Sequence, residues 1–255
     1  MTLTHGSGPL ARPGPDTVNY AIDGPRNRLL LHPFPRRVRA EVGGETVLDT
    51  ERGQLLHEST LLPVLYVPSD DVRQDLLERT KRRTRCPYKG AATYWTIRAG
   101  GEVRENAVWG YEDPIPDAAW LKGLVAVYPD RVDRWLDEDE PVHKLRDPYH
   151  RVDVRRSSRA VRVTAGDEVL AESSRALVLS ETGLPNRYYV PLQDVRAVLS
   201  DSATQAHCPY KGDARYFHVN GLEDAAWSYD APFDGLQAVA GHVSFDGEGI
   251  SLEAS

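Results

Sequence analysis

Cys-Pro-Tyr-Lys-Gly stands at Cys86–Gly90 and again at Cys208–Gly212. The chain has two cysteines, and both lie in this pentapeptide. Proline after each cysteine disfavours a helix at the cysteine, and the closing glycine permits a positive φ or a close backbone approach. The repeat therefore predicts a duplicated domain. It marks the pentapeptide either as a structural pin of each domain or as its working site.

The similarity continues on both sides of the pentapeptide. The matched pairs are Val38 with Val161, Arg52 with Arg175, Glu58 with Glu181, Tyr66 with Tyr189, Asp71 with Asp194, Tyr94 with Tyr216, Trp109 with Trp227, Tyr111 with Tyr229 and Pro114 with Pro232. Each unit is about a hundred residues long, which suits a whole domain rather than a solenoid repeat. We expect the two copies to pack as a pseudo-dimer.

The matched segments also set the expected domain limits. We expect a first repeat domain at residues 20–140, a linker at 141–157 and a second repeat domain at 158–255. The linker is charged and contains two prolines. Residues 1–19 are rich in glycine and proline and lack an apolar core, so we expect a disordered arm there.

Apolar residues alternate with polar ones within each unit. Val38, Ala40 and Val42 follow this period of two, as do their counterparts from Val161 onward, and the pattern is typical of half-buried strands. A capped apolar pattern after each Tyr-Val-Pro sequence predicts one short helix. The expected fold class is mainly β, with two tandem domains of antiparallel strands that each carry one short helix.

The composition limits the classes of function. The net charge of −7 argues against a general nucleic-acid binder, and no apolar run reaches membrane-spanning length. One cysteine per domain favours reduced thiols, so we expect a cytoplasmic protein. The eight histidines show no paired metal-ligand spacing and no phosphate-binding loop is present, so we expect no metal and no cofactor.

The pentapeptide has two chemical interpretations. A thiol activated by the adjacent lysine or by His207 could act as a nucleophile, and the lysine could bind an anion or form a Schiff base. The alternative is structural: a buried cysteine, a tyrosine packed on the core, and a lysine paired with Glu58 or Glu181. Both interpretations remain open from the residues alone.

The residues around the pentapeptide allow the same two interpretations. A carboxylate, a lysine and tyrosines in each domain could form a polar pocket for a small molecule, or an ion pair beneath a hairpin. The aromatic pairs Trp109 with Tyr111 and Trp227 with Tyr229 could wall such a pocket, although aromatic residues at this spacing are more often core.

The chain resembles the domain-of-unknown-function 427 family in its tandem form. The resemblance rests on Cys-Pro-Tyr-Lys-Gly-x-Ala-x-Tyr at 86–94 and 208–216, on the flanking Tyr-Val-Pro, and on Trp-x-Tyr-x-x-Pro. It implies a β-tent architecture, shared with zinc-binding Mss4-like proteins. Zinc members use two Cys-x-x-Cys pairs, which this chain lacks. The family is sometimes labelled nucleotidyltransferase-like, but neither copy shows clustered carboxylates for Mg²⁺ in a shared element.

The two copies differ around the pentapeptide. The second has Arg187-Tyr188-Tyr189, close to the family's Arg-Tyr-Tyr pattern, whereas the first has Val64-Leu65-Tyr66. The second copy is therefore the preferred working site.

We expect an uncharacterised small-molecule enzyme or ligand-binding protein, with a non-catalytic β-domain pair for protein interaction as the alternative. The expected partners are an unidentified small molecule and a second copy in a homo-oligomer, without nucleic acid or membrane. The catalytic candidates are Glu181, Cys208, Lys211 and Tyr189. The ligand-binding candidates are Glu58, Tyr66, Cys86, Tyr88, Lys89, Trp109, Tyr111, Arg187, Tyr188, Tyr210, Tyr216, Trp227 and Tyr229.

Overall fold

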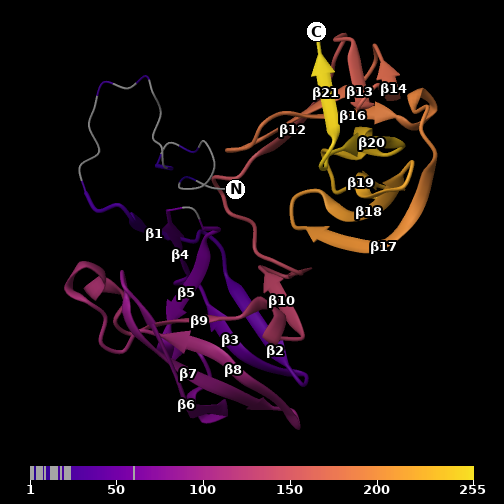
Figure 1. Cartoon of the computed structure of the whole chain (residues 1–255). Coiled ribbons are helices and arrows are strands. Elements are labelled where there is room, and N and C mark those ends of the chain that lie inside the picture. The colour runs from indigo at the N-terminus through magenta and orange to yellow at the C-terminus, as the bar shows by residue number, and fades with distance from the viewer. Residues whose placement is uncertain are drawn as a thin grey trace. The chain divides into compact units, whose positions relative to one another are not determined.

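A computed structural model describes residues 3, 8, 10, 11, 17, 19, 24–59 and 61–255. The chain divides into two compact units, Met1–Tyr149 and His150–Ser255 (Figure 1). Most of the arm predicted at residues 1–19 lies outside the described residues.

The first unit contains two antiparallel sheets (Figure 1). In spatial order, the larger sheet consists of β1 (Leu29–Pro33), β4 (Gln54–Glu58), β5 (Val64–Pro68), β9 (Leu124–Val127), β8 (Glu102–Gly110), β7 (Gly90–Ala99) and β6 (Leu77–Cys86). The smaller sheet consists of β11 (Glu140–Val142), β10 (Arg134–Asp137), β2 (Val38–Val42) and β3 (Glu45–Thr50).

The second unit repeats this plan. Its larger sheet consists of β12 (Val152–Arg156), β15 (Leu177–Glu181), β16 (Arg187–Pro191), β20 (His242–Phe245), β19 (Leu222–Tyr229), β18 (Gly212–Val219) and β17 (Leu199–Cys208). Its smaller sheet consists of β14 (Glu168–Ser173), β13 (Val161–Ala165) and β21 (Ile250–Ala254). The strand order of the larger sheets is the same, so the mainly β fold with two repeated domains is confirmed.

One face of each larger sheet packs on the smaller sheet. In the first unit, Val38, Ala40 and Val42 are fully buried there, together with Ile97 and Val108 of the larger sheet. Because successive side chains of a strand point to opposite faces, Arg39 and Glu41 remain partly exposed. The predicted period-two strands are therefore confirmed.

The other face of each larger sheet holds a second, aromatic cluster. It contains Tyr66, Tyr94 and Tyr111 in the first unit, and Tyr189 and Tyr229 in the second. The pentapeptide cysteines pack against these clusters rather than against the core between the sheets. The alternation along β5 and β16 thus directs the candidate tyrosines to the pentapeptide side.

The helical segments among the described residues are short 3-10 helices. They are η1 (Ser69–Asp71), η2 (Gln74–Leu76), η3 (Pro116–Leu121), η4 (Pro129–Arg131), η5 (Leu192–Asp194) and η6 (Gln237–Val239). The expected helix after each Tyr-Val-Pro is η1 or η5, and it lasts only three residues. Each ends because the next residue, Val72 or Val195, returns to extended backbone and bridges to the smaller sheet.

The stretch predicted as a linker contains regular structure. Within 141–157, Val152–Arg156 form β12, the first strand of the second larger sheet. Val152 and Val154 are half-buried against that unit's aromatic cluster, an alternation that the surrounding charges concealed. Ahead of β12, Tyr149 belongs to the first unit, where its hydroxyl lies 2.5 Å from His32 Nε2.

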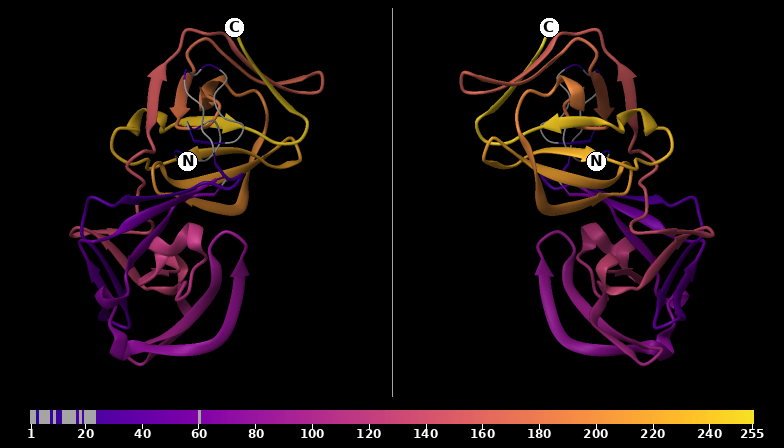
Figure 2. Two further views of the ribbon diagram at one scale, coloured as in Figure 1. Left: turned by 90° about the vertical axis from the view of Figure 1, so that its left-hand side faces the viewer. Right: turned by 90° about the vertical axis from the view of Figure 1, so that its right-hand side faces the viewer.

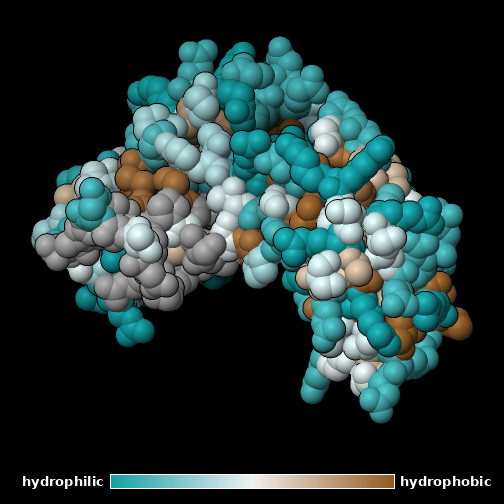
Figure 3. Space-filling model, turned by 90° about the horizontal axis from the view of Figure 1, so that it is seen from above, coloured by the Kyte–Doolittle hydropathy of each residue, from teal (hydrophilic) through white to brown (hydrophobic). Residues whose placement is uncertain are grey.

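The exposed surface is mainly hydrophilic, as expected when the apolar side chains are buried in the cores. Hydrophilic residues predominate on the face seen in Figure 3, where the hydrophobic residues form separate small patches. Within the part of the chain that the structure describes, no helix has both the length and the apolar composition needed to cross a membrane.

Candidate functional site

Each pentapeptide forms the turn of a long, curved hairpin (Figure 2). In the first unit β6 ends at Cys86 and β7 begins at Gly90, and these two residues pair across the strands. The amide of Lys89 donates to the carbonyl of Cys86 at 3.4 Å, and Lys211 repeats this bond to Cys208 at 3.3 Å. These hydrogen bonds fix the backbone of each lysine next to the last residue of the preceding strand.

The closing glycine is required by a neighbouring segment. Gly90 has a φ of +110°, and a Cβ there would lie 3.3 Å from backbone atoms of Asp113 and Ile115. The amide of Ile115 donates to the carbonyl of Lys89 at 3.1 Å. Gly212 has a φ of +109° and the same close approach. The Trp-x-Tyr-x-x-Pro segment and the pentapeptide are thus parts of one structure.

The first lysine is paired and mostly buried. Lys89 Nζ donates to Glu58 Oε2, at the end of β4, and both side chains are 11% exposed. Asn27 Nδ2 donates to the other carboxylate oxygen at 2.9 Å. This is the ion pair that the structural interpretation of the pentapeptide predicted.

The second unit contains the same arrangement, except that a histidine takes the place of the asparagine. Lys211 Nζ donates to Glu181 Oε2 at 2.6 Å, and His150 Nε2 lies 3.0 Å from Glu181 Oε1. The side chains of Glu181 and His150 are 8% and 1% exposed. Asn27 and His150 each stand two residues ahead of the first strand of their larger sheet. The histidine of one unit therefore replaces the asparagine of the other.

A buried tyrosine lies near each ion pair, Tyr66 near Glu58 and Tyr189 near Glu181. Trp227 Nε1 donates to the hydroxyl of Tyr189 at 3.1 Å. Burial is the main cause that raises the pKa of Tyr189 above its usual range, and nearby Glu181 and Cys208 raise it further. Burial likewise raises the pKa of Tyr66, with Glu58 and Cys86 nearby. These phenols stay protonated, so they can donate hydrogen bonds but not act as bases.

The structure thus brings the four catalytic candidates together. Tyr189 and Cys208 belong to the same side-chain cluster, Glu181 lies near enough to Tyr189 to help raise the pKa of its hydroxyl, and Lys211 bonds to Glu181. Both cysteines are free and half-buried. Tyr111 and Tyr229 are buried in the same clusters, whereas Trp109, Tyr216 and Trp227 are partly buried against them.

Tyr188 and Tyr189 of the second unit lie on opposite faces of the larger sheet. Tyr188 packs on the core between the sheets, whereas its neighbour Tyr189 faces the pentapeptide. Arg187 pairs with Asp246 at 2.7 Å and lies over the Trp227 ring. Arg187 and Tyr188 line a cavity of about 450 Å³, with Phe245 and Ile250 among its other walls. The Arg-Tyr-Tyr sequence is therefore divided between two faces of the sheet.

A larger pocket lies beside the first pentapeptide. Its volume is about 530 Å³, and its walls include Pro87, Tyr88, Ile115, Trp120 and Asn27. Tyr88 and Trp120 are 40% and 41% exposed. In the second unit the ring of the equivalent tyrosine, Tyr210, lies against that of His150, with the centroids 3.9 Å apart and the planes tilted by 42°. The two identical pentapeptides therefore have different surroundings.

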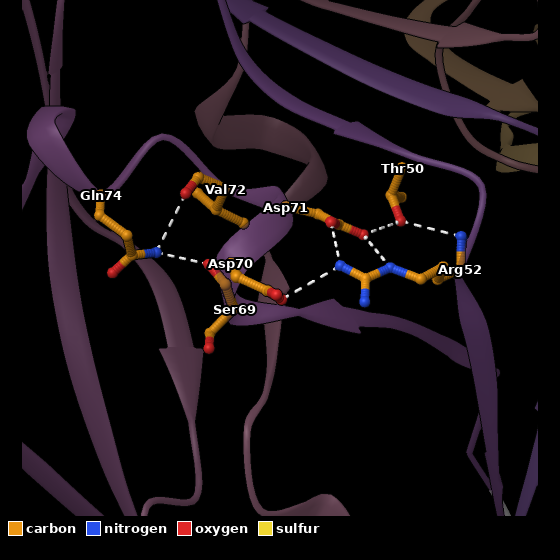
Figure 4. A network of polar contacts seen from close by, with 7 residues as sticks. All are labelled: Thr50, Arg52, Ser69, Asp70, Asp71, Val72 and Gln74. Carbon is orange, nitrogen blue, oxygen red and sulfur yellow. Dashed lines mark hydrogen bonds and ion pairs between the residues drawn. The ribbon is translucent and has the colours of Figure 1, made fainter.

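A second repeated network links the two sheets of each unit, and Figure 4 shows it in the first unit. Arg52 pairs with Asp71, which also accepts from Thr50 Oγ1 at 2.5 Å. In the second unit Arg175 pairs with Asp194 at 2.7 Å, and this hydrogen bond is the main cause that lowers the pKa of Asp194. The matched Arg and Asp residues of the sequence repeat thus have a structural role.

Sequence reasoning missed three residues of the site region. Asn27 and His150 precede the matched segments and differ in type, so the repeat did not reveal them. Strand pairing of Leu29 with Glu58, and of Val152 with Glu181, brings them to the carboxylates. Trp120 aligns with Ala238, because each stands six residues after the matched proline, Pro114 or Pro232, and this unmatched aromatic was the available signal.

Fold and site together define a two-domain, mainly β protein with a buried lysine–glutamate pair under one hairpin of each domain. The family model described as "Domain of unknown function (DUF427)" matches residues 30–138 and 153–254. The chain belongs to this family, in a tandem form. No curated protein matches the chain.

Proposed function

We propose that the chain binds a small organic molecule in the pocket beside the first pentapeptide. A volume of about 530 Å³ falls within the usual range for small-molecule sites. The exposed rings of Tyr88 and Trp120 are large apolar surfaces at its rim. Pro25, Leu29 and Ile115 add apolar walls, and Arg28 and Asp117 add polar ones. A flat, partly apolar ligand with one or two polar groups suits these walls.

One observation carries this proposal: Asn27 both lines the pocket and donates to Glu58. The buried pair of Glu58 and Lys89 thereby fixes a pocket wall. Lys89 also belongs to the turn that presents Tyr88. In this proposal the ion pair positions the binding surface and does not itself react.

The buried pairs also favour a second candidate function, a non-catalytic β-domain pair that binds another protein. The observation behind it is that Lys211 and Glu181 repeat the pairing in the second unit, where the ring of Tyr210 lies against His150. The lysine–glutamate pair occurs in both units, whereas the pocket does not, and this is expected if the pair has a structural role. The two candidate functions differ in whether the first unit holds a small molecule.

Native mass spectrometry of the freshly purified full chain separates these candidates. We expect a retained mass on the wild type, and its loss in the Trp120→Ala variant. The second unit has alanine at the equivalent position, so the domain fold tolerates that residue. Leu62→Ala is the matched control, because Leu62 is 59% exposed in the same unit and does not line the pocket. Equal ligand retention in Trp120→Ala and Leu62→Ala would argue against the proposed pocket.

A further inference from the structure

Strand β6 carries four cations within five residues: Lys81, Arg82, Arg83 and Arg85. All four are exposed. Among the described residues, none of them has a carboxylate within ion-pair distance, whereas Arg79 of the same strand pairs with Glu112 at 2.5 Å. Unpaired cations at this density stand out on a chain whose net charge is −7.

The hairpin itself does not need these cations. The equivalent positions of β17 hold Ala203, Thr204, Gln205 and His207. Yet β17 pairs with β18 in the same register, including the irregularity that β6 shows against β7. The positive charge is therefore a feature of the first unit's surface, not of the fold.

Some backbone groups of β6 already have hydrogen-bond partners and are not available to an added strand. At the irregularity, the amide of Arg82 donates to Thr80 Oγ1 at 3.3 Å. Arg83 Nη1 donates to the carbonyls of Thr80 and Arg82 at 3.0 and 2.7 Å. Although β6 is an edge strand (Figure 1), these groups are already occupied. A ligand would therefore meet the cationic side chains rather than the backbone, which disfavours a peptide that adds as a strand.

The positions of the cations suit a chain of phosphates. Arg83 and Arg85 are two residues apart, so they share a face of the strand at a spacing of about 6–7 Å. Guanidinium groups bind phosphate oxygens in a bidentate manner. Arg82 lies 4.7 Å from the centre of the Tyr94 ring, which restricts its position. Beyond Cys86 the strand leads to Tyr88, whose ring is 40% exposed and available for stacking.

We propose that the β6 edge binds single-stranded nucleic acid, with phosphates on Lys81, Arg83 and Arg85 and a base on Tyr88. The net charge of −7 predicted no nucleic-acid partner, but it sums over the whole chain, whereas these cations lie together on one strand. This inference goes beyond the small-molecule pocket and shares only Tyr88 with it. The cations can be changed without altering the pocket walls, so either proposal can fail alone.

Fluorescence anisotropy with a labelled oligothymidylate of about 12 nucleotides tests this proposal on the full chain. The variant Lys81→Ala/Arg83→Gln/Arg85→His carries the residues of β17, which the same hairpin tolerates. Loss of three phosphate contacts should lower the affinity on the order of 100-fold at about 0.1 M salt. The slope of log affinity against log salt should become shallower by about 2.

A matched control removes the same charge elsewhere. Arg156→Gln/Arg159→Gln/Arg162→Gln changes three exposed arginines of the second unit, and we expect nearly unchanged affinity. The reciprocal variant Ala203→Lys/Gln205→Arg should increase binding. The proposal is overturned if the wild type does not bind the oligonucleotide, if the control weakens binding equally, or if poly-glutamate binds as tightly. Equally tight binding of poly-glutamate would indicate that β6 binds an acidic polypeptide.

Discussion

At the scale of single residues, each pentapeptide lysine is an ion-pair partner under a hairpin. Lys89 bonds to Glu58 and Lys211 to Glu181, and the side-chain exposures lie between 8% and 14%. A buried ion pair gives little net stability, but removing one partner leaves a buried charge and is strongly destabilising. The lysines are thus better placed to support the hairpin than to attack a substrate.

We therefore expect Lys211→Met to destabilise the second unit by about 3–5 kcal/mol, because the buried Glu181 carboxylate would lose its lysine partner. Adding Glu181→Gln should recover part of that loss, since the carboxylate left without its lysine is then removed. Hydrogen exchange of the β15 and β18 amides measures the change within this unit. A cost below about 0.5 kcal/mol for Lys211→Met would show that the pair is not a structural pin.

At the scale of elements, the hairpin turn depends on the segment that follows the next strand. The backbone around Pro114 approaches Gly90 so closely that a side chain would meet it. This explains why the pentapeptide and the Trp-x-Tyr-x-x-Pro sequence occur together in both units. The turn and η3, which carries Trp120, are therefore held as one piece.

Replacing Gly90 with alanine should cost more than the same change at Gly101. Both glycines have positive φ, which costs about 1–3 kcal/mol for alanine. The added Cβ of Gly90→Ala would also press on backbone at 3.3 Å, whereas nothing lies within 4 Å at Gly101. Overpacking of this kind adds about 1–3 kcal/mol. Urea denaturation of the two variants compares them, and equal midpoints would contradict the coupling of the turn to Pro114.

Much of the element level could be predicted from the sequence. The period-two runs from Val38 and Val161 are strands, and the matched aromatic pairs lie in the clusters beside the pentapeptide. The β12 strand was missed because charged neighbours mask the alternation of Val152 and Val154. Tyr188 and Tyr189 were assigned to one site, although adjacent residues of a strand face opposite sides.

The site region was predictable where the two copies agree. The pairing of each lysine with Glu58 or Glu181 was foreseen as the structural alternative, because all four residues are matched in the repeat. Asn27 and His150 were not foreseen, since their contact with the carboxylates exists only through the pairing of the first strands. Matching identical residues reveals shared structure and conceals what distinguishes the copies.

At the scale of the whole molecule, two units share one plan but differ at their surfaces. Both contain the buried lysine–glutamate pair, the aromatic cluster and the Arg–Asp network. The 530 Å³ pocket and the cations of β6 belong to the first unit. In the second unit the equivalent surface has Ala238 in place of Trp120, and the ring of Tyr210 lies against His150. This asymmetry supports a binding role for the first unit and moves the proposal away from the copy that the sequence favoured.

The most direct test of the central claim compares the two tyrosines of the identical pentapeptides. Native mass spectra of full-length Tyr88→Ala and Tyr210→Ala would be recorded beside the wild type, with circular dichroism to confirm that both variants are folded. We expect Tyr88→Ala to lose the retained small molecule and Tyr210→Ala to keep it. Retention in Tyr88→Ala together with loss in Tyr210→Ala would place the ligand at the second pentapeptide and contradict the account.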